Sequence, residues 1–166
     1  MAQPIEILLP TLEVTMSNES NDETRRPVIV FPVEVTVRPW TIERGVPMFP
    51  TQHQYVEMLW LPVIGPSTTW LLRRLSGWAL ACPEGLTVVL PELSESLGLG
   101  WSSGSGSSVQ RSMRRLIMFG LARWTDALDV ATMVPAVSER HLARMSPALV
   151  RAHDRMIQQL GDCAAA

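Results

Sequence analysis

Residues 98–122 read GLGWSSGSGSS followed directly by VQRSMRRLIMFGLA, a Gly/Ser-rich loop that leads into an amphipathic stretch. At about 100° per residue, one side of the expected helix gathers the apolar side chains Val109, Met113, Leu116, Ile117 and Leu121. The opposite side carries Arg111, Arg114, Arg115 and Met118. We therefore expect one face of this helix to pack in the core and the other to present positive charge.

Small polar residues and a glycine mark the expected ends of this helix. Ser107 or Ser108 can serve as the N-cap, and only a cap at Ser107 places Gln110 where a capping box needs it. Gly120 indicates the C-terminal end.

The neighbouring segments predict a strand, a short helix and a hairpin. Upstream, residues 86–90 (LTVVL) are typical of a strand, and Pro91 begins a helical turn that runs to residue 97. Downstream, residues 121–125 (LARWT) and 129–134 (DVATMV) form two expected strands, joined by a turn of hairpin length at residues 126–128. The expected order is strand, short helix, loop, helix and hairpin.

This order resembles the winged helix-turn-helix superfamily of DNA-binding proteins, as found in small regulators of actinobacterial or phage type. The resemblance covers residues 65–134 and rests on the pattern Leu93-x3-Leu97-Gly98 followed by Val109-x3-Met113-x2-Leu116-Ile117-x2-Gly120-Leu121. It implies that the third helix enters the major groove and that the hairpin is the wing. The resulting fold class is α+β, with a winged helix-turn-helix core, an N-terminal β arm and a C-terminal helix.

Two features of the chain depart from the superfamily. The loop between the second and third helices is about twice as long as the usual turn of roughly three or four residues. The expected wing carries Asp126 and Asp129, which we expect to repel phosphate.

The basic residues are unevenly distributed. All 14 are Arg and none is Lys, which indicates GC-rich coding and, second, selection for phosphate or guanine recognition. The net charge is −2, but residues 61–125 hold six Arg against three acidic residues, whereas residues 1–60 hold four against eight. Any nucleic-acid face must therefore lie in the middle of the chain.

Composition divides the chain into four parts. We expect a flexible acidic leader at residues 1–26, and an extended β arm with a Pro-rich strap at residues 27–50. Residues 51–138 form the winged domain, in which Thr51 caps a helix that Pro62 ends and residues 65–81 form the first helix of the core. Residues 139–166 form a helical extension that either mediates dimerisation or completes the monomer core, with fraying expected from residue 161.

The chemistry of enzymes and metal sites has little support. Cys82 and Cys163 lie far apart without metal-ligand spacing, which fits a reduced protein. The three His residues lack partners at zinc-site spacing, and the Gly/Ser-rich loop lacks the Lys of a phosphate-binding P-loop. No apolar run reaches the roughly 18 residues of a membrane span. We expect a cytoplasmic protein without catalysis, metal, cofactor, small-molecule substrate or membrane partner.

The Arg side of the main helix carries the functional hypothesis. A charged face is ordinary for a surface helix, but no Asp or Glu lies between residues 96 and 125 to pair with it. The expected base readers are Ser108, Gln110, Arg111 and Arg115. The expected backbone contacts are Ser107, Arg114 and Arg123.

These residues predict a transcriptional regulator or a phage or plasmid factor that binds duplex DNA as a homodimer. The alternative is a protein-interaction adaptor, in which the winged domain does not bind DNA and the apolar arm at residues 28–37 recruits a partner.

Overall fold

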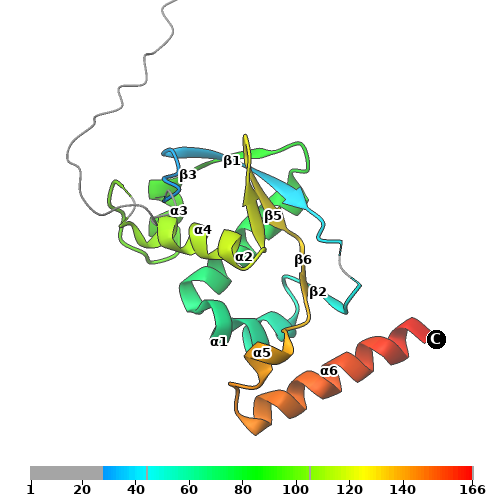
Figure 1. Ribbon diagram of the computed structural model, residues 1–166. Coiled ribbons are helices and arrows are strands. Elements are labelled where there is room, and N and C mark those ends of the chain that lie inside the picture. The colour runs from blue at the N-terminus through cyan, green and yellow to red at the C-terminus, as the bar shows by residue number, and fades with distance from the viewer. Residues whose placement is uncertain (1–27, 44, 105, 166) are drawn as a thin grey trace, which may run out of the picture.

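The computed structural model describes residues 28–43, 45–104 and 106–165 (Figure 1). Its strands are β1 (Glu34–Trp40), β2 (Met48–Pro50), β3 (Leu86–Val89), β4 (Ala122–Trp124), β5 (Leu128–Ala131) and β6 (Met133–Pro135). Its helices are the π-helical turn η1 (Val56–Trp60), α1 (Leu61–Ile64), α2 (Pro66–Ala81), α3 (Leu90–Ser96), α4 (Ser108–Met118), α5 (Glu139–Leu142) and α6 (Pro147–Ala165). The α+β class is confirmed, while the expected leader lies outside the described residues.

Strand β1 lies in the middle of a four-stranded sheet of order β3-β1-β5-β4. It pairs antiparallel with β3, where Val35 lies opposite Val88, and parallel with β5, where Val37 lies opposite Leu128. Both β1 valines are 1% exposed, because alternate side chains of a strand point to the same face. The expected arm is therefore a central strand, and it continues through Trp40 into the segment expected to be a strap.

The second half of the expected hairpin divides into two strands. At Thr132 the backbone N–H donates to Trp40 O at 3.1 Å, and the backbone C=O accepts from Thr51 N at 3.1 Å. These bonds end β5 and turn the chain, so that β6 pairs antiparallel with β2 in a separate two-stranded sheet. The segment expected to be a strap thus supplies a strand.

Two expected helix signals near residue 60 are wrong. Pro62 does not end the first helix, because the π-helical turn η1 runs directly into α1 and Pro62 lies inside this continuous helical segment. The chain turns instead at Gly65, whose φ of 81° a residue with a Cβ rarely adopts. Thr51 does not cap the helix, since its hydroxyl lies 2.6 Å from Ser76 Oγ.

Helix α2 packs against the sheet strands β1 and β5 and against helices α1 and α4. Its inward side chains Leu71, Leu72 and Leu75 are at most 1% exposed, as their spacing predicts. Burying each of them contributes about 1.5–3 kcal/mol to folding. This helix therefore joins the sheet to α4, the helix with the Arg face.

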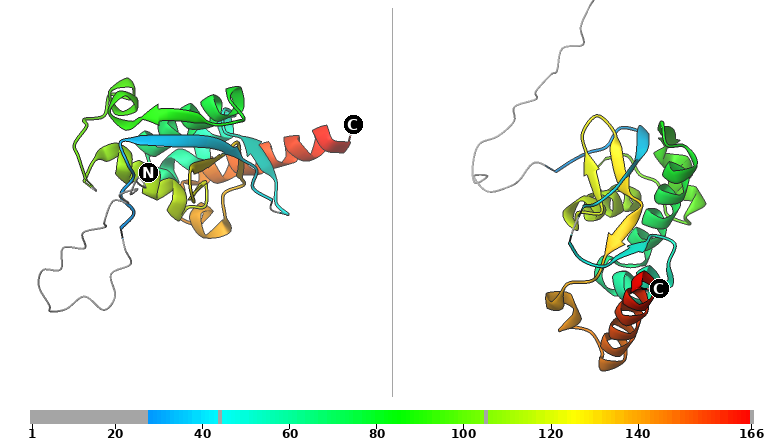
Figure 2. Two further views of the ribbon diagram at one scale, coloured as in Figure 1. Left: turned by 90° about the horizontal axis from the view of Figure 1, so that it is seen from above. Right: turned by 90° about the vertical axis from the view of Figure 1, so that its right-hand side faces the viewer.

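Helix α6 extends from one end of the molecule (Figures 1 and 2). Its apolar side chains Leu149, Met156, Ile157 and Leu160 pack against the main core. Its His153 Nδ1 lies 2.7 Å from the hydroxyl of Tyr55, which also accepts the Val137 N–H at 2.9 Å. The helix continues to Ala165, past the residue where we expected fraying. Dimerisation through this helix stays a prediction.

Tyr55→Phe tests how much the hydrogen bonds of the Tyr55 hydroxyl, to His153 of α6 and to Val137, contribute to stability. Tyr55 is 0% exposed and burial raises the pKa of its hydroxyl, so the substitution leaves the buried Val137 N–H without an acceptor. We expect the free energy of unfolding to fall by about 1–3 kcal/mol in denaturant titrations. His153→Ala keeps the bond to Val137 and should cost less, whereas an unchanged midpoint for Tyr55→Phe would contradict the proposed contribution.

Candidate nucleic-acid interface

Helix α4 forms with the two-sided pattern that its sequence predicts. Val109, Met113 and Leu116 are 0% exposed, and the helix packs against α2 and α3. At its C-terminus Gly120 has a φ of 66°, and the N–H of Leu121 reaches Leu116 O at 2.9 Å. This bond and the one from Gly120 N to Ile117 O at 3.0 Å form a Schellman motif, so the expected glycine stop is confirmed.

The outer side of α4 presents two guanidinium groups. Arg111 and Arg115 are exposed, and neither forms an ion pair within the part of the chain that the structure describes. Arg111 Nη2 donates to Ser108 Oγ at 3.1 Å, which orients it along the helix. Met118, at the end of the same side, is 70% exposed.

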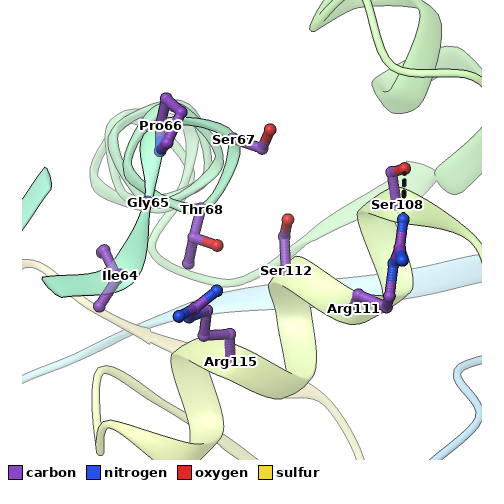
Figure 3. A pocket seen from close by; sticks show the side chains of 9 residues that line it. All are labelled: Ile64, Gly65, Pro66, Ser67, Thr68, Ser108, Arg111, Ser112 and Arg115. Atoms are coloured by element: carbon purple, nitrogen blue, oxygen red, sulfur yellow. Dashed lines mark hydrogen bonds between the residues drawn. The ribbon is translucent and has the colours of Figure 1, made fainter. Parts of the chain in front are cut away.

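Arg111 and Arg115 border a hollow of about 280 Å³ between α4 and the start of α2 (Figure 3). Its lining residues are Ile64, Gly65, Pro66, Ser67, Thr68, Ser108, Arg111, Ser112 and Arg115. The lining contains two guanidinium groups and four hydroxyls, and it contains no carboxylate. The hollow therefore favours an anionic ligand.

The half of this hollow that α2 supplies is not predicted by the sequence. On α4, Ser108, Arg111, Ser112 and Arg115 follow the spacing i, i+3, i+4, i+7, so they share one face. This spacing indicates that Ser112 lies beside Arg111 and Arg115 on α4. No sequence pattern indicates that Ser67 and Thr68 lie opposite this face, because the contact joins segments that are distant in the chain.

Gln110 is not on the accessible side of α4. It is 2% exposed, and its side-chain amide accepts from Phe31 N at 3.1 Å and donates to Phe31 O at 3.0 Å. These two bonds satisfy the backbone N–H and C=O groups of Phe31, just before β1, as a neighbouring strand would. The expectation that Gln110 reads a base is therefore corrected, and so is its expected capping-box role.

Ser107 occupies the N-cap position of α4 but makes no cap bond through its side chain. It is 1% exposed, and among the described residues its hydroxyl is a buried side-chain group without a hydrogen-bond partner. The expectation that it touches a DNA phosphate is therefore corrected, because its side chain does not reach the surface.

Arg114 lies between the two faces of α4. Its Nη1 donates to Ile29 O at 3.0 Å, and the side chain is partly buried. Burial lowers the pKa of Arg114, and the nearby charge of Arg111 lowers it further. The bond to Ile29 O connects α4 to the segment before β1, so Arg114 has a structural role. Its expected contact with the DNA backbone stays a prediction.

The hairpin β4–β5 carries a network of charges that neutralise one another. Asp129, which is 4% exposed, accepts from Arg38 Nε at 2.9 Å and from Arg123 Nε at 2.8 Å. Arg38 also donates to Asp126 at 2.8 Å, and Arg123 lies 5.0 Å from the Trp40 ring centroid. The two aspartates are therefore paired, which weakens the expected repulsion of phosphate. Arg123 is also paired, with Asp129, although we expected it to contact the DNA backbone.

No family model matches this chain, and the searches of curated proteins and of solved structures return no match either. Within the described segments, no helix combines the length and hydrophobicity needed to cross a bilayer. In the same segments, no three His, Cys, Asp or Glu side chains gather where they could hold a metal ion.

Asp126→Asn tests the charge network of the hairpin. Bonding to Arg38 lowers the pKa of Asp126 from 3.8 to about 2. A carboxyl with a lowered pKa stabilises the fold fully above pH 3.8, and this contribution is lost as the pH falls toward 2. Urea midpoints of the wild type and the variant should therefore converge over this interval. Asp154→Asn, on the exposed side of α6, is the control, and parallel curves for Asp126→Asn would contradict the pairing.

Proposed function

We propose that this protein binds duplex DNA through the exposed side of α4, as a winged helix-turn-helix protein. The order α2, β3, α3, α4 and the hairpin β4–β5 supports the proposal, since the superfamily has this order. In this assignment α4 is the helix that approaches the major groove and the hairpin is the wing. The protein then acts in the cytoplasm as a transcriptional regulator or as a phage or plasmid factor, and a homodimer stays a prediction.

The observation that carries the proposal is the pair Arg111 and Arg115, which are exposed, one turn apart and unpaired with any described carboxylate. A guanidinium group binds phosphate or the O6 and N7 atoms of guanine with two parallel hydrogen bonds. The net charge of −2 is compatible with DNA binding at α4, because the hairpin residues Asp126 and Asp129 are paired with Arg38 and Arg123.

The geometry reduces the set of DNA-contacting residues. Ser108, Arg111 and Arg115 line the hollow and remain in the set, whereas Arg114 is already bonded to Ile29 O. Gln110 and Ser107 are removed from the set because they are buried. In this proposal the wing contacts DNA through the backbone of the hairpin. Arg123 does not supply these contacts, because it forms an ion pair with Asp129.

Arg111→Ala with Arg115→Ala tests the proposal. The double variant should bind a GC-rich duplex more weakly, and the slope of log affinity against log salt should fall by about 1 for each phosphate contact that is lost. Fluorescence anisotropy at several salt concentrations measures both quantities. Arg151→Ala with Arg155→Ala is the matched control, since these exposed residues are also one turn apart but lie on α6. Equal affinity and slope in both double variants would refute the role of α4.

A second candidate function is an adaptor that binds a protein partner. It is favoured by Val28, Val30 and Val33, which are 57%, 56% and 54% exposed just before β1. The remaining valines of the expected arm, Val35 and Val37, are buried in the sheet and are not available to a partner.

A gel shift with random GC-rich duplex at low salt separates the two candidates. A DNA-binding protein should retain a Kd of about 10⁻⁴–10⁻⁶ M even for non-specific duplex at physiological salt, and a lower Kd at low salt. Absence of a shift with the wild-type protein, together with a loss of partner capture on replacing Val28, Val30 and Val33 by Ser, would favour the adaptor.

A further inference from the structure

We propose that the hollow between α2 and α4 is a binding site for one phosphate group. The ligands would be the guanidinium groups of Arg111 and Arg115, the hydroxyls of Thr68 and Ser112, and the first-turn amides of α2. The inference deepens the proposed function and rests on it for the source of the phosphate, which is the phosphodiester backbone of a duplex.

The start of α2 supplies backbone donors. This 16-residue helix begins at Pro66 after Gly65, and no side chain caps it. The N–H groups of Ser67 and Thr68 therefore lie in the uncapped first turn, at the positive end of the helix dipole. Such helix starts favour phosphate when cations converge on them.

Two unpartnered hydroxyl side chains that line the hollow indicate a ligand independently of the helix dipole. Thr68 is 4% exposed and Ser112 is 5% exposed, and both line the hollow. Neither side chain forms a hydrogen bond with any residue that the structure describes. Figure 3 shows them on facing helices, with the Ser112 hydroxyl directed toward the start of α2. Both hydroxyls open onto the hollow and have no partner among the described residues, so a bound oxyanion would accept a hydrogen bond from each of them.

The charges at the hollow are all of one sign. Arg111 and Arg115 are four residues apart on α4, and like charges at this spacing destabilise a helix. Arg115 extends across the hollow toward Thr68, which brings its charge to the positive end of α2 (Figure 3). No carboxylate lines the hollow to offset these charges. A phosphate would relieve the repulsion and accept from all these donors.

This site changes the expected division of roles on α4. Arg111 and Arg115 hold phosphate in it, so they position the protein on DNA and contribute little to the choice of sequence. Their loss should weaken binding to all duplexes by a similar factor, whereas loss of a base reader weakens binding to one sequence most.

Inorganic phosphate is the first probe, titrated into the full-length protein against chloride of equal ionic strength. We expect saturable amide NMR shifts at Ser67, Thr68 and Ser112, with a Kd of about 1 mM. Arg111→Gln with Arg115→Gln should weaken binding at least about tenfold, because two charge-assisted bonds are lost. Arg151→Gln with Arg155→Gln, on α6, should leave it unchanged.

Small changes inside the hollow keep the test independent of charge. Thr68→Val and Ser112→Ala each remove one hydroxyl, and each should weaken phosphate binding about threefold. The proposal is overturned if phosphate gives no saturable shift at the start of α2. It is also overturned if the shifts persist unchanged in the Arg111→Gln and Arg115→Gln variant.

Competition with a short duplex identifies the source of the phosphate. If duplex displaces inorganic phosphate from the hollow, the backbone is the natural ligand. If phosphate binds but duplex does not, the site stands with a free phosphate or phosphomonoester as its ligand, and the proposed function fails. If phosphate binds to neither protein, while duplex binds the Arg111→Gln and Arg115→Gln variant more weakly than the wild type, the phosphate site fails and DNA binding through α4 stands.

Discussion

The pairing of β1 with strands from two distant parts of the chain is the constraint on which the rest of the structure depends. β3 follows α2 and β5 follows β4, and β1 hydrogen-bonds to both. Because side chains alternate along a strand, a shift of one residue would expose Val35 and Val37 and bury their neighbours. Burial of these two valines therefore fixes the register, and the register fixes the positions of the residues before and after β1.

Two contacts at the ends of β1 connect this register to the candidate interface. Before the strand, the backbone of Phe31 is held by the buried amide of Gln110, so α4 is tied to the sheet. Near its other end, Arg38 lies between Asp126 and Asp129 and pairs with both. The sheet thus anchors the recognition helix of the proposed function and also neutralises the acidic hairpin.

The arginines of the middle segment have different environments, although the sequence treats them alike. Arg123 is paired with Asp129, and Arg114 is bonded to a carbonyl group and partly buried. Arg111 and Arg115 face a hollow without carboxylates. An acidic protein can therefore keep a local cationic surface, since tertiary contacts absorb some charges and leave others.

The sequence by itself determined the elements that depend on local patterns. The two faces of α4, its stop at Gly120, the strand β3 and the first helix of the core all follow from side-chain periodicity and from backbone preferences that act within a few residues. The tertiary structure alone decided the central place of β1, the burial of Gln110, the pairing of Asp129 and the position of Thr68 and Ser112 on opposite sides of one hollow. Each of these depends on which distant segment supplies the partner, and hydrophobic patterning specifies that a face is buried without specifying against what.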